Sequence, residues 1–223
     1  MPARVICISR ALAAGGEVVG HQVAERLGFR YLDEEIVALA AERAELDPEV
    51  VADVERRRSF VRRLFEGGGG AEDALTRASV DFGDDELTRA AVAKRPSRAA
   101  DFRALIRQVI YEQAEEGSVV IVAHAASIAL RGRPDLLRVL VTASVDTRAR
   151  RVADEHDLDR KEAAEIVRES DTARLDYLKR FYGYGEETAA DYDLVINTDV
   201  LTPTMAVELT LSAAAMIDPE LSL

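Results

Sequence analysis

Short apolar segments recur along this chain, and segments with helical spacing separate them. The clearest is Val119–Ala123, a continuous apolar run that is typical of a strand buried on both faces. Further strands are predicted over residues 5–9, 137–142 and 192–196. Because apolar strands alternate with helices, the sequence predicts a three-layer α/β fold, with a parallel sheet flanked by helices on both faces.

The predicted helices are bounded by apolar spacing, N-cap residues and C-terminal glycines. They cover residues 17–28, 33–45, 47–65, 98–116, 124–131, 145–156, 160–182 and 203–217. Four consecutive glycines at 67–70 end the third helix. The polar, weakly patterned stretch from there to residue 97 is predicted to be irregular.

Composition narrows the functional classes. The 223 residues are 48% hydrophobic and 31% charged, which is ordinary for a globular protein of one domain with an appendage, or of two small lobes. The net charge of −12 argues against a nucleic-acid polymer as partner, because its phosphates would be repelled, but converging arginines could still hold a small phosphate ligand. Cys7 is the only cysteine and is expected to be a packed thiol. With no signal sequence or membrane-spanning run, the protein is expected to be cytoplasmic and to have no membrane partner.

Ligands in open parallel sheets bind beyond the carboxyl ends of the strands. The segments expected there are residues 9–16, 31–33, 124–127, 143–144 and 197–199.

The first of these segments joins a strand to a helix and contains the pair Gly15-Gly16. Backbone N–H groups and the dipole at a helix N-terminus attract anions, and glycines let the backbone approach a ligand closely. The loop is therefore either a phosphate site or a simple turn. As a nucleotide site it would be lined by Ser9, Arg10, Ala14, Gly15, Gly16 and Glu17.

The loop does not match the full P-loop pattern GxxxxGK[ST]. Gly16 stands at the position of the lysine, and the Ser or Thr that would bind magnesium is also absent. Arg10 is the only cation in the loop and could fold back over the phosphates.

Several segments, in this order and spacing, resemble the cytidylate-kinase-like family, a divergent branch of the P-loop nucleoside monophosphate kinases. The resemblance covers most of the chain but is weak over residues 46–100. It rests on Val5–Arg10, Gly15-Gly16, Val23–Gly28, Tyr31–Asp33, Val119–Ala126, Val139–Ser144 with Arg148 and Arg151, Ser170–Tyr177, and Tyr192–Thr198.

The resemblance implies a P-loop kinase core, formed by residues 1–45 and 98–223, with a helical lid near 148–182. A helical or irregular lobe on the monophosphate side would be inserted over residues 46–97. The implied reaction transfers the γ-phosphoryl group of ATP to a nucleoside monophosphate such as CMP or dCMP, with Mg²⁺ as cofactor. Positioning and charge neutralisation carry most of such catalysis.

The resemblance assigns Arg148, Arg151, Arg174 and Asp171 to the lid that closes over the transferring group. Arg148 and Arg151 are three residues apart and share one helical face. In each case the alternative is an ordinary surface charge or a helix-surface ion pair.

On the acceptor side, the resemblance assigns Asp33 to the base or sugar, although Asp33 also suits a helix N-cap. His124 stands where the family has an arginine, so it is either a weaker ligand for the monophosphate or a histidine at the end of a strand.

The loss of the lysine, the hydroxyl and the arginine leaves three functions open. The chain is a phosphotransferase, a catalytically degenerate relative that senses a nucleotide or binds a protein, or a scaffold that uses the arginine-bearing helix 47–65. The apolar residues of the last helix serve either the core or a homodimer seam; they are Met205, Leu209, Leu211 and Met216.

Overall fold

The computed structural model describes a defined set of residues, namely 3–33, 36, 39–40, 43, 95–122, 125–185 and 187–217, with the backbone alone for 95–103, 180 and 181. By their contacts, residues 1–36 with 107–223 form one compact unit and residues 37–106 a second one. The helix predicted over 33–45 lies largely outside the described residues. The helix predicted over 47–65 and the glycines at 67–70 lie wholly outside them. The limits of the predicted lobe, 46–97, stay a prediction.

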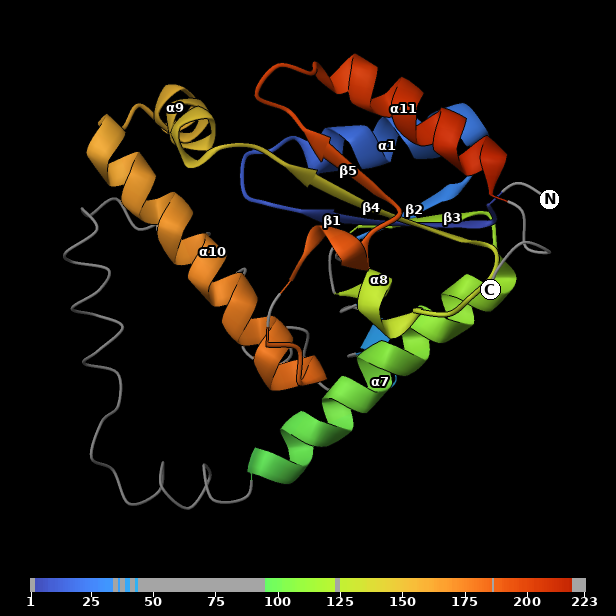
Figure 1. Ribbon diagram of the computed structural model, residues 1–223. Helices are drawn as coiled ribbons and strands as arrows, with labels where there is room; N and C mark the ends of the chain where they lie inside the picture. Colours follow the sequence, from blue (N-terminus) through green and yellow to red (C-terminus); the bar gives the residue numbers. More distant parts are fainter. Residues whose placement is uncertain are drawn as a thin grey trace. The chain divides into compact units, whose positions relative to one another are not determined.

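A five-stranded parallel sheet forms the centre of the larger unit (Figure 1). In order across the sheet, its strands are β2 (Arg30–Leu32), β3 (Val119–Val122), β1 (Val5–Arg10), β4 (Leu136–Thr142) and β5 (Leu194–Asn197). Four of the five strands match predicted ones. The sequence did not mark β2, because its three residues begin with an exposed arginine and form no apolar run.

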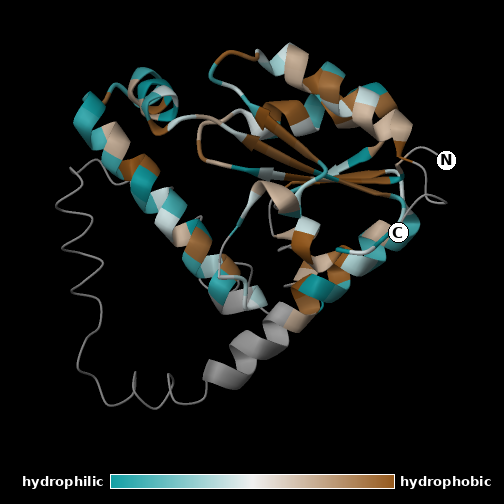
Figure 2. Cartoon of the chain, in the orientation of Figure 1, coloured by the Kyte–Doolittle hydropathy of each residue, from teal (hydrophilic) through white to brown (hydrophobic). Residues whose placement is uncertain are grey.

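The inner strands are buried on both faces, as their continuous apolar runs predicted. All of β3 and all but the last residue of β1 are buried, whereas β5, at the edge of the sheet, is largely exposed. Figure 2 shows that the strands are mostly hydrophobic, the edge strand β5 included. Cys7 is buried in β1, and burial raises the pKa of its thiol far above the ordinary value, which confirms the packed thiol.

The helices among the described residues are α1 (Gly16–Leu27), α7 (Arg95–Glu116), α8 (Ala126–Ala129), α9 (Val145–His156), α10 (Arg160–Tyr182) and α11 (Pro203–Met216). Each overlaps a predicted helix, and a 3₁₀ turn, η1 (Ala189–Asp191), precedes β5. The side chains of Ser144, Asp159 and Thr202 cap the starts of α9, α10 and α11. None of these described helices combines the length and apolar composition that a bilayer span requires.

Helices cover both faces of the sheet, so the predicted three-layer α/β fold is confirmed. In Figure 1, α1 and α11 lie side by side over one face, and α8 lies on the other face with the last part of α7. The Tyr111 hydroxyl of α7 donates to the carbonyl of Ala129 at 2.7 Å and joins these two helices.

Of the four large apolar residues singled out on α11, only Leu211 packs against the core. Met205, Leu209 and Met216 are exposed, and Leu211 is partly buried. Smaller residues face the core instead, namely Ala206, Val207, Thr210 and Ala214. The predicted homodimer seam therefore stays a prediction.

The direction of the chain connections reverses beside β1. From β1 the chain passes through α1 to β2, on the far side of β3, whereas from β4 it continues to β5 at the opposite edge. In open parallel sheets, ligands bind outside the carboxyl ends of strands at such a reversal. The fold therefore directs attention to the end of β1 at Arg10.

Candidate functional site

The loop between β1 and α1 turns sharply around two glycines. Ala13 and Gly15 take left-handed backbone angles, with φ of 58° and 87°. A Cβ atom at Gly16 would lie 2.6 Å from the Cβ of Arg10, so only glycine lets the chain fold back here. The space beside Gly15 is open, because a Cβ atom there would meet nothing within 4 Å.

The carbonyl groups of this loop are bound by the protein. Arg151 Nη1 donates to the carbonyl of Ala13 at 2.9 Å, and Thr198 Oγ1 donates to that of Ala14 at 2.9 Å. The carbonyl of Ala11 accepts from the amide of Ala14 at 3.1 Å. The loop is thus fixed through its acceptors.

The amides at the start of α1 have no comparable partners. Gly15 caps the helix without a side-chain hydrogen bond, and the contacts of the described residues include no acceptor for the amides of residues 15–18. The first amides of a helix find no acceptor within it, and with the helix dipole they favour a bound anion. Open amides and engaged carbonyls suit a phosphate group over Gly15 and Gly16.

Arg10, the cation of the loop, is paired with two carboxylates. Its Nε lies 2.9 Å from Glu17 Oε1, and its Nη2 lies 3.4 Å from Asp33 Oδ2. The side chains of Arg10 and Asp33 are only 17% and 15% exposed, so the second ion pair is shielded from water. A phosphate that bound Arg10 would have to compete with these two acids.

Arg151 joins the loop to the end of β5. Besides the carbonyl of Ala13, it donates to Thr198 Oγ1 at 3.0 Å and to the carbonyl of Thr198 at 2.6 Å. Because Thr198 also donates to Ala14, one arginine and one threonine hold adjacent carbonyls of the loop. In this structure the guanidinium of Arg151 therefore serves the loop backbone.

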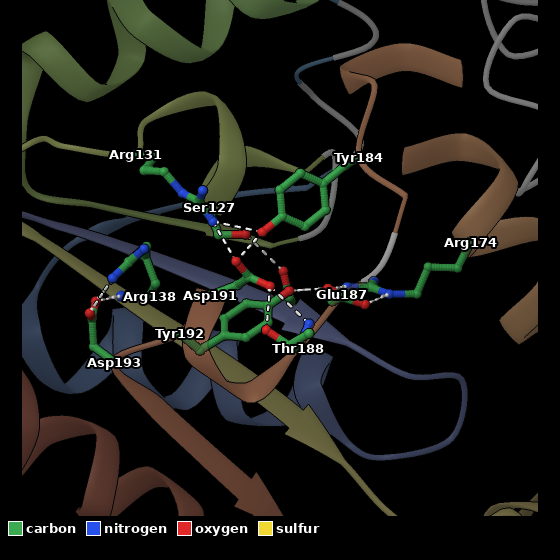
Figure 3. A network of polar contacts seen from close by, with 11 residues as sticks. Ser127, Arg131, Arg138, Arg174, Tyr184, Glu187, Thr188, Asp191, Tyr192 and Asp193 are labelled. Carbon is green, nitrogen blue, oxygen red and sulfur yellow. Dashed lines mark hydrogen bonds and ion pairs between the residues drawn. The ribbon is translucent and has the colours of Figure 1, made fainter. Parts of the chain in front are cut away.

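Arg174 reaches the same loop from α10. Its Nη1 donates to the carbonyl of Arg10 at 3.1 Å, while its Nε donates to Glu187 at 2.7 Å and its Nη2 forms a second bond to the same carboxylate. The Tyr192 hydroxyl donates to Glu187 from the other side (Figure 3). The side chains of Arg174 and Glu187 are 10% and 11% exposed, so this is a buried ion pair directly beside the loop.

The surroundings of Arg174 favour its charged form. Burial opposes the charged form of Arg174, but the hydrogen bonds and charge of Glu187 outweigh it and raise the pKa of the guanidinium. Burial also raises the pKa of Tyr192 to about 12, so its hydroxyl remains a donor at neutral pH.

Arg148 and Asp171 form a separate ion pair. Arg148 donates to both carboxylate oxygens of Asp171, at 2.9 and 2.7 Å, and through Nε to the carbonyl of Ala143 at 3.0 Å. The pair links α9 to α10. Of the four residues that the sequence assigned to the lid, two thus bind the loop and two bind each other.

Ser9 lies under the loop in a buried polar contact. Its hydroxyl is 3.0 Å from that of Ser127 at the start of α8, and it is also a hydrogen-bond partner of Tyr192. The contact connects the end of β1 with the segment after β3. His124, predicted on the acceptor side, lies outside the described residues.

The sequence analysis did not single out Thr198, Glu187 or Tyr192 as members of the site. Thr198 fell within a segment, 197–199, that was expected at the carboxyl end of a strand. Glu187 had no such signal, because it lies in an irregular stretch between α10 and η1. Among the described residues, no three histidine, cysteine, aspartate or glutamate side chains gather to hold a metal ion.

Two curated proteins with similar sequences are cytidylate kinases. Over 103 residues the chain is 29% identical to a cytidylate kinase of Ignicoccus hospitalis, a match that spans 46% of this chain and 59% of that protein. Over 95 residues it is 33% identical to a cytidylate kinase of Methanopyrus kandleri, a match that spans 39% of this chain and 49% of that protein. The chain therefore spans only about half the length of the curated relatives that it matches.

Solved structures show the same fold at low identity. An uncharacterized protein from Eubacterium ventriosum aligns with a TM-score of 0.62 at 18% identity, covering 95% of this chain and 98% of that one. A gluconokinase from Sinorhizobium meliloti aligns with a TM-score of 0.52 at 15% identity, covering 99% and 95%. The family model described as the cytidylate kinase-like family matches residues 5–200, and the chain belongs to this family.

Proposed function

We propose that this chain is a phosphotransferase that seats the phosphates of ATP on the loop after β1 and transfers the γ-phosphoryl group to a nucleoside monophosphate of the CMP or dCMP type. The observation that carries the proposal is the contrast within the loop. Its carbonyls are bound by Arg151, Thr198 and the loop itself, while the described residues provide no acceptor for the amides at the start of α1. Membership of the cytidylate kinase-like family supports the acceptor class.

In this proposal the triphosphate is held by the loop residues Ser9, Arg10, Ala14, Gly15, Gly16 and Glu17. Main-chain amides supply most of the contacts, because the loop carries no lysine. Arg10 adds positive charge once a phosphate replaces Glu17 or Asp33 as its partner.

The lid residues act from α9 and α10. Arg151 and Arg174 already contact the loop backbone, so each is within one side-chain movement of a phosphate on it. Arg148 and Asp171 contribute by joining the two helices, so that the arginines on both arrive together. Asp33 and His124 are proposed to contact the acceptor nucleotide.

Magnesium would come with the nucleotide. The loop lacks the Ser or Thr that follows the lysine in the P-loop pattern, but Mg²⁺ in phosphoryl-transfer sites keeps several waters and is held largely by substrate phosphates. When bound, it would neutralise charge across the phosphates. Glu17 and Asp33, the two carboxylates in contact with Arg10, are the residues of the chain that would hold it.

The test is Gly15→Ala compared with Gly132→Ala. The two glycines have almost the same φ, 87° and 89°, and a Cβ atom at either would meet nothing within 4 Å. Both variants should lose about 1 kcal/mol of stability from the same backbone strain. Only the methyl group at Gly15 would occupy the space of the phosphate, so we expect ATP affinity to fall by about tenfold or more in that variant alone.

Calorimetry with ATP and a coupled assay for ADP formation in the presence of CMP or dCMP measure the two parts of the proposal. Equal ATP affinity in the two variants would remove the loop from the nucleotide site.

A second candidate function is nucleotide binding without turnover. The pairing of Arg10 with two carboxylates favours it, since a loop that lacks lysine and has its one arginine neutralised provides little charge stabilisation for a transferring group. ATP binding with no ADP formation, with any nucleoside monophosphate as acceptor, would support this second candidate over the first.

A further inference from the structure

The guanidinium of Arg174 is almost fully occupied by protein groups. Glu187 accepts from Nε and Nη2, the carbonyl of Arg10 accepts from Nη1 at 3.1 Å, and the Tyr192 hydroxyl lies 3.4 Å from Nη2. These contacts use all but one of the N–H donors of the side chain. The edge of the guanidinium that would form a paired contact with a phosphate is filled by a carboxylate.

A guanidinium binds a carboxylate and a phosphate with the same paired geometry, so the two compete for it. The role proposed for Arg174 therefore requires an exchange in which Glu187 gives way to a phosphate. The exchange is short in distance, because Arg174 already touches Arg10, and Arg10 packs against the first residue of α1.

Glu187 keeps a hydrogen-bond donor when Arg174 moves away from it. The Tyr192 hydroxyl donates to its carboxylate (Figure 3). Tyr192 in turn forms a hydrogen bond with Ser9 at the end of β1. Loss of the arginine costs less free energy for a buried carboxylate that keeps another hydrogen-bond donor than for one that keeps none. Glu187 can thus release Arg174 and take it back without a change in the fold.

We propose that Glu187 is a latch for Arg174: it holds the guanidinium beside the phosphate loop in the nucleotide-free protein, and the phosphates must displace it to bind. The latch rests on the proposed function, since it requires a phosphate on the loop. Its consequence is a reduced affinity for nucleotide, because only the fraction of molecules with Arg174 released is fully competent to bind.

The test compares Glu187→Gln with the unaltered protein. Glutamine keeps the size of the side chain and an acceptor oxygen but loses the charge that competes with phosphate. We expect both ATP and inorganic tripolyphosphate to bind about tenfold more tightly by calorimetry, and the KM for ATP to fall in parallel. The gain should disappear in Glu187→Gln combined with Arg174→Lys, because lysine cannot form the paired contact.

Asp193→Asn is the matched control. Asp193 also binds an arginine through both carboxylate oxygens, since Arg138 donates to them at 3.1 and 2.6 Å. Asp193 immediately precedes β5, and the contacts of the described residues include none between Asp193 and the loop. A general effect of breaking such a pair would appear in both variants, whereas the latch predicts tighter binding only in Glu187→Gln.

A measurement on the unaltered protein covers the case in which Glu187→Gln fails to fold. The nitrogen-15 NMR signal of the Arg174 Nε–H group, identified by its absence in Arg174→Lys, should shift when tripolyphosphate saturates the protein. The Arg138 signal should remain fixed. An Arg174 signal that does not move overturns the latch.

Failure of the latch and failure of the proposed function give different results. If the unaltered protein binds ATP but Glu187→Gln shows no gain, the latch is wrong and the proposed function stands. If neither protein binds ATP or tripolyphosphate, the proposed function fails and the latch fails with it.

Discussion

Two arginine–carboxylate pairs, each with one residue on α10, have the same chemistry but differ in burial and in what they contact. Arg148 with Asp171 and Arg174 with Glu187 each join a guanidinium to both oxygens of one carboxylate. The Asp171 side chain is 36% exposed, and its pair links α9 to α10. The Glu187 side chain is 11% exposed, and its pair lies against the loop between β1 and α1.

The difference shows that one sequence pattern can hold two functions. The family resemblance grouped Arg148, Arg151, Arg174 and Asp171 as one set of lid residues. In the structure, the first pair links α9 to α10, and the second holds Arg174 where it also donates to the carbonyl of Arg10 in the loop. Arg148 cannot change its partner without loosening the contact between α9 and α10. Arg174 can do so, because its partner Glu187 does not link these helices.

The largest expected effect tests the burial of the second pair. Arg174→Met should lower the free energy of unfolding by about 3–5 kcal/mol, because it leaves the Glu187 carboxylate buried without its cation. Urea denaturation measures this loss. The double variant Arg174→Met with Glu187→Leu should recover most of it, since an apolar pair of similar volume removes the buried charge.

The recovery in the double variant is the decisive comparison. If the double variant is as unstable as Arg174→Met, then the loss comes from packing or from the bond to the carbonyl of Arg10, and the buried charge is not its cause.

A smaller effect is expected from the first pair. Arg148→Met should cost about 2–3 kcal/mol, because Asp171 is exposed enough to be hydrated once its partner is gone. The carbonyl of Ala143 also loses its donor. Denaturation in urea at matched pH measures both variants, and a loss larger than that of Arg174→Met would reverse the order that burial predicts.

The sequence predicted the fold and the residue types of the site better than their contacts. Apolar runs located β1, β3 and β4, because the inner strands of a parallel sheet are covered on both faces and consist mostly of apolar residues. The glycine pair marked the loop, because Gly16 must leave space for Arg10. These are local constraints, and a local pattern can show them.

The partners of the arginines are not local. Asp171 is 23 residues from Arg148, and Glu187 is 13 residues from Arg174, with no helical spacing that joins them. Glu187 comes close to Arg174 only because the chain returns from the end of α10 toward β5. The sequence could identify Arg148 and Arg174 as members of one group. It could not tell that Arg148 links two helices while Arg174 lies beside the loop.

The last effect appears only at alkaline pH and comes from Tyr192, whose hydroxyl donates to Glu187 of the second pair. Its pKa is raised from its ordinary value of about 10 to about 12, first by burial and then by the nearby Glu187, against the lowering effects of Arg174 and Ser9. A raised pKa in the folded state stabilises the protein below the pKa of the unfolded chain, and the contribution is lost as the pH rises through the folded pKa. The free energy of unfolding should therefore fall between about pH 10 and pH 12, and this part of the fall should be absent in Tyr192→Phe. Ultraviolet titration of tyrosinate measures the pKa directly. If Tyr192 ionises near pH 10 in the folded protein, its hydroxyl is in contact with water. Glu187 would then be no better shielded from water than Asp171, and the contrast between the two pairs would fail.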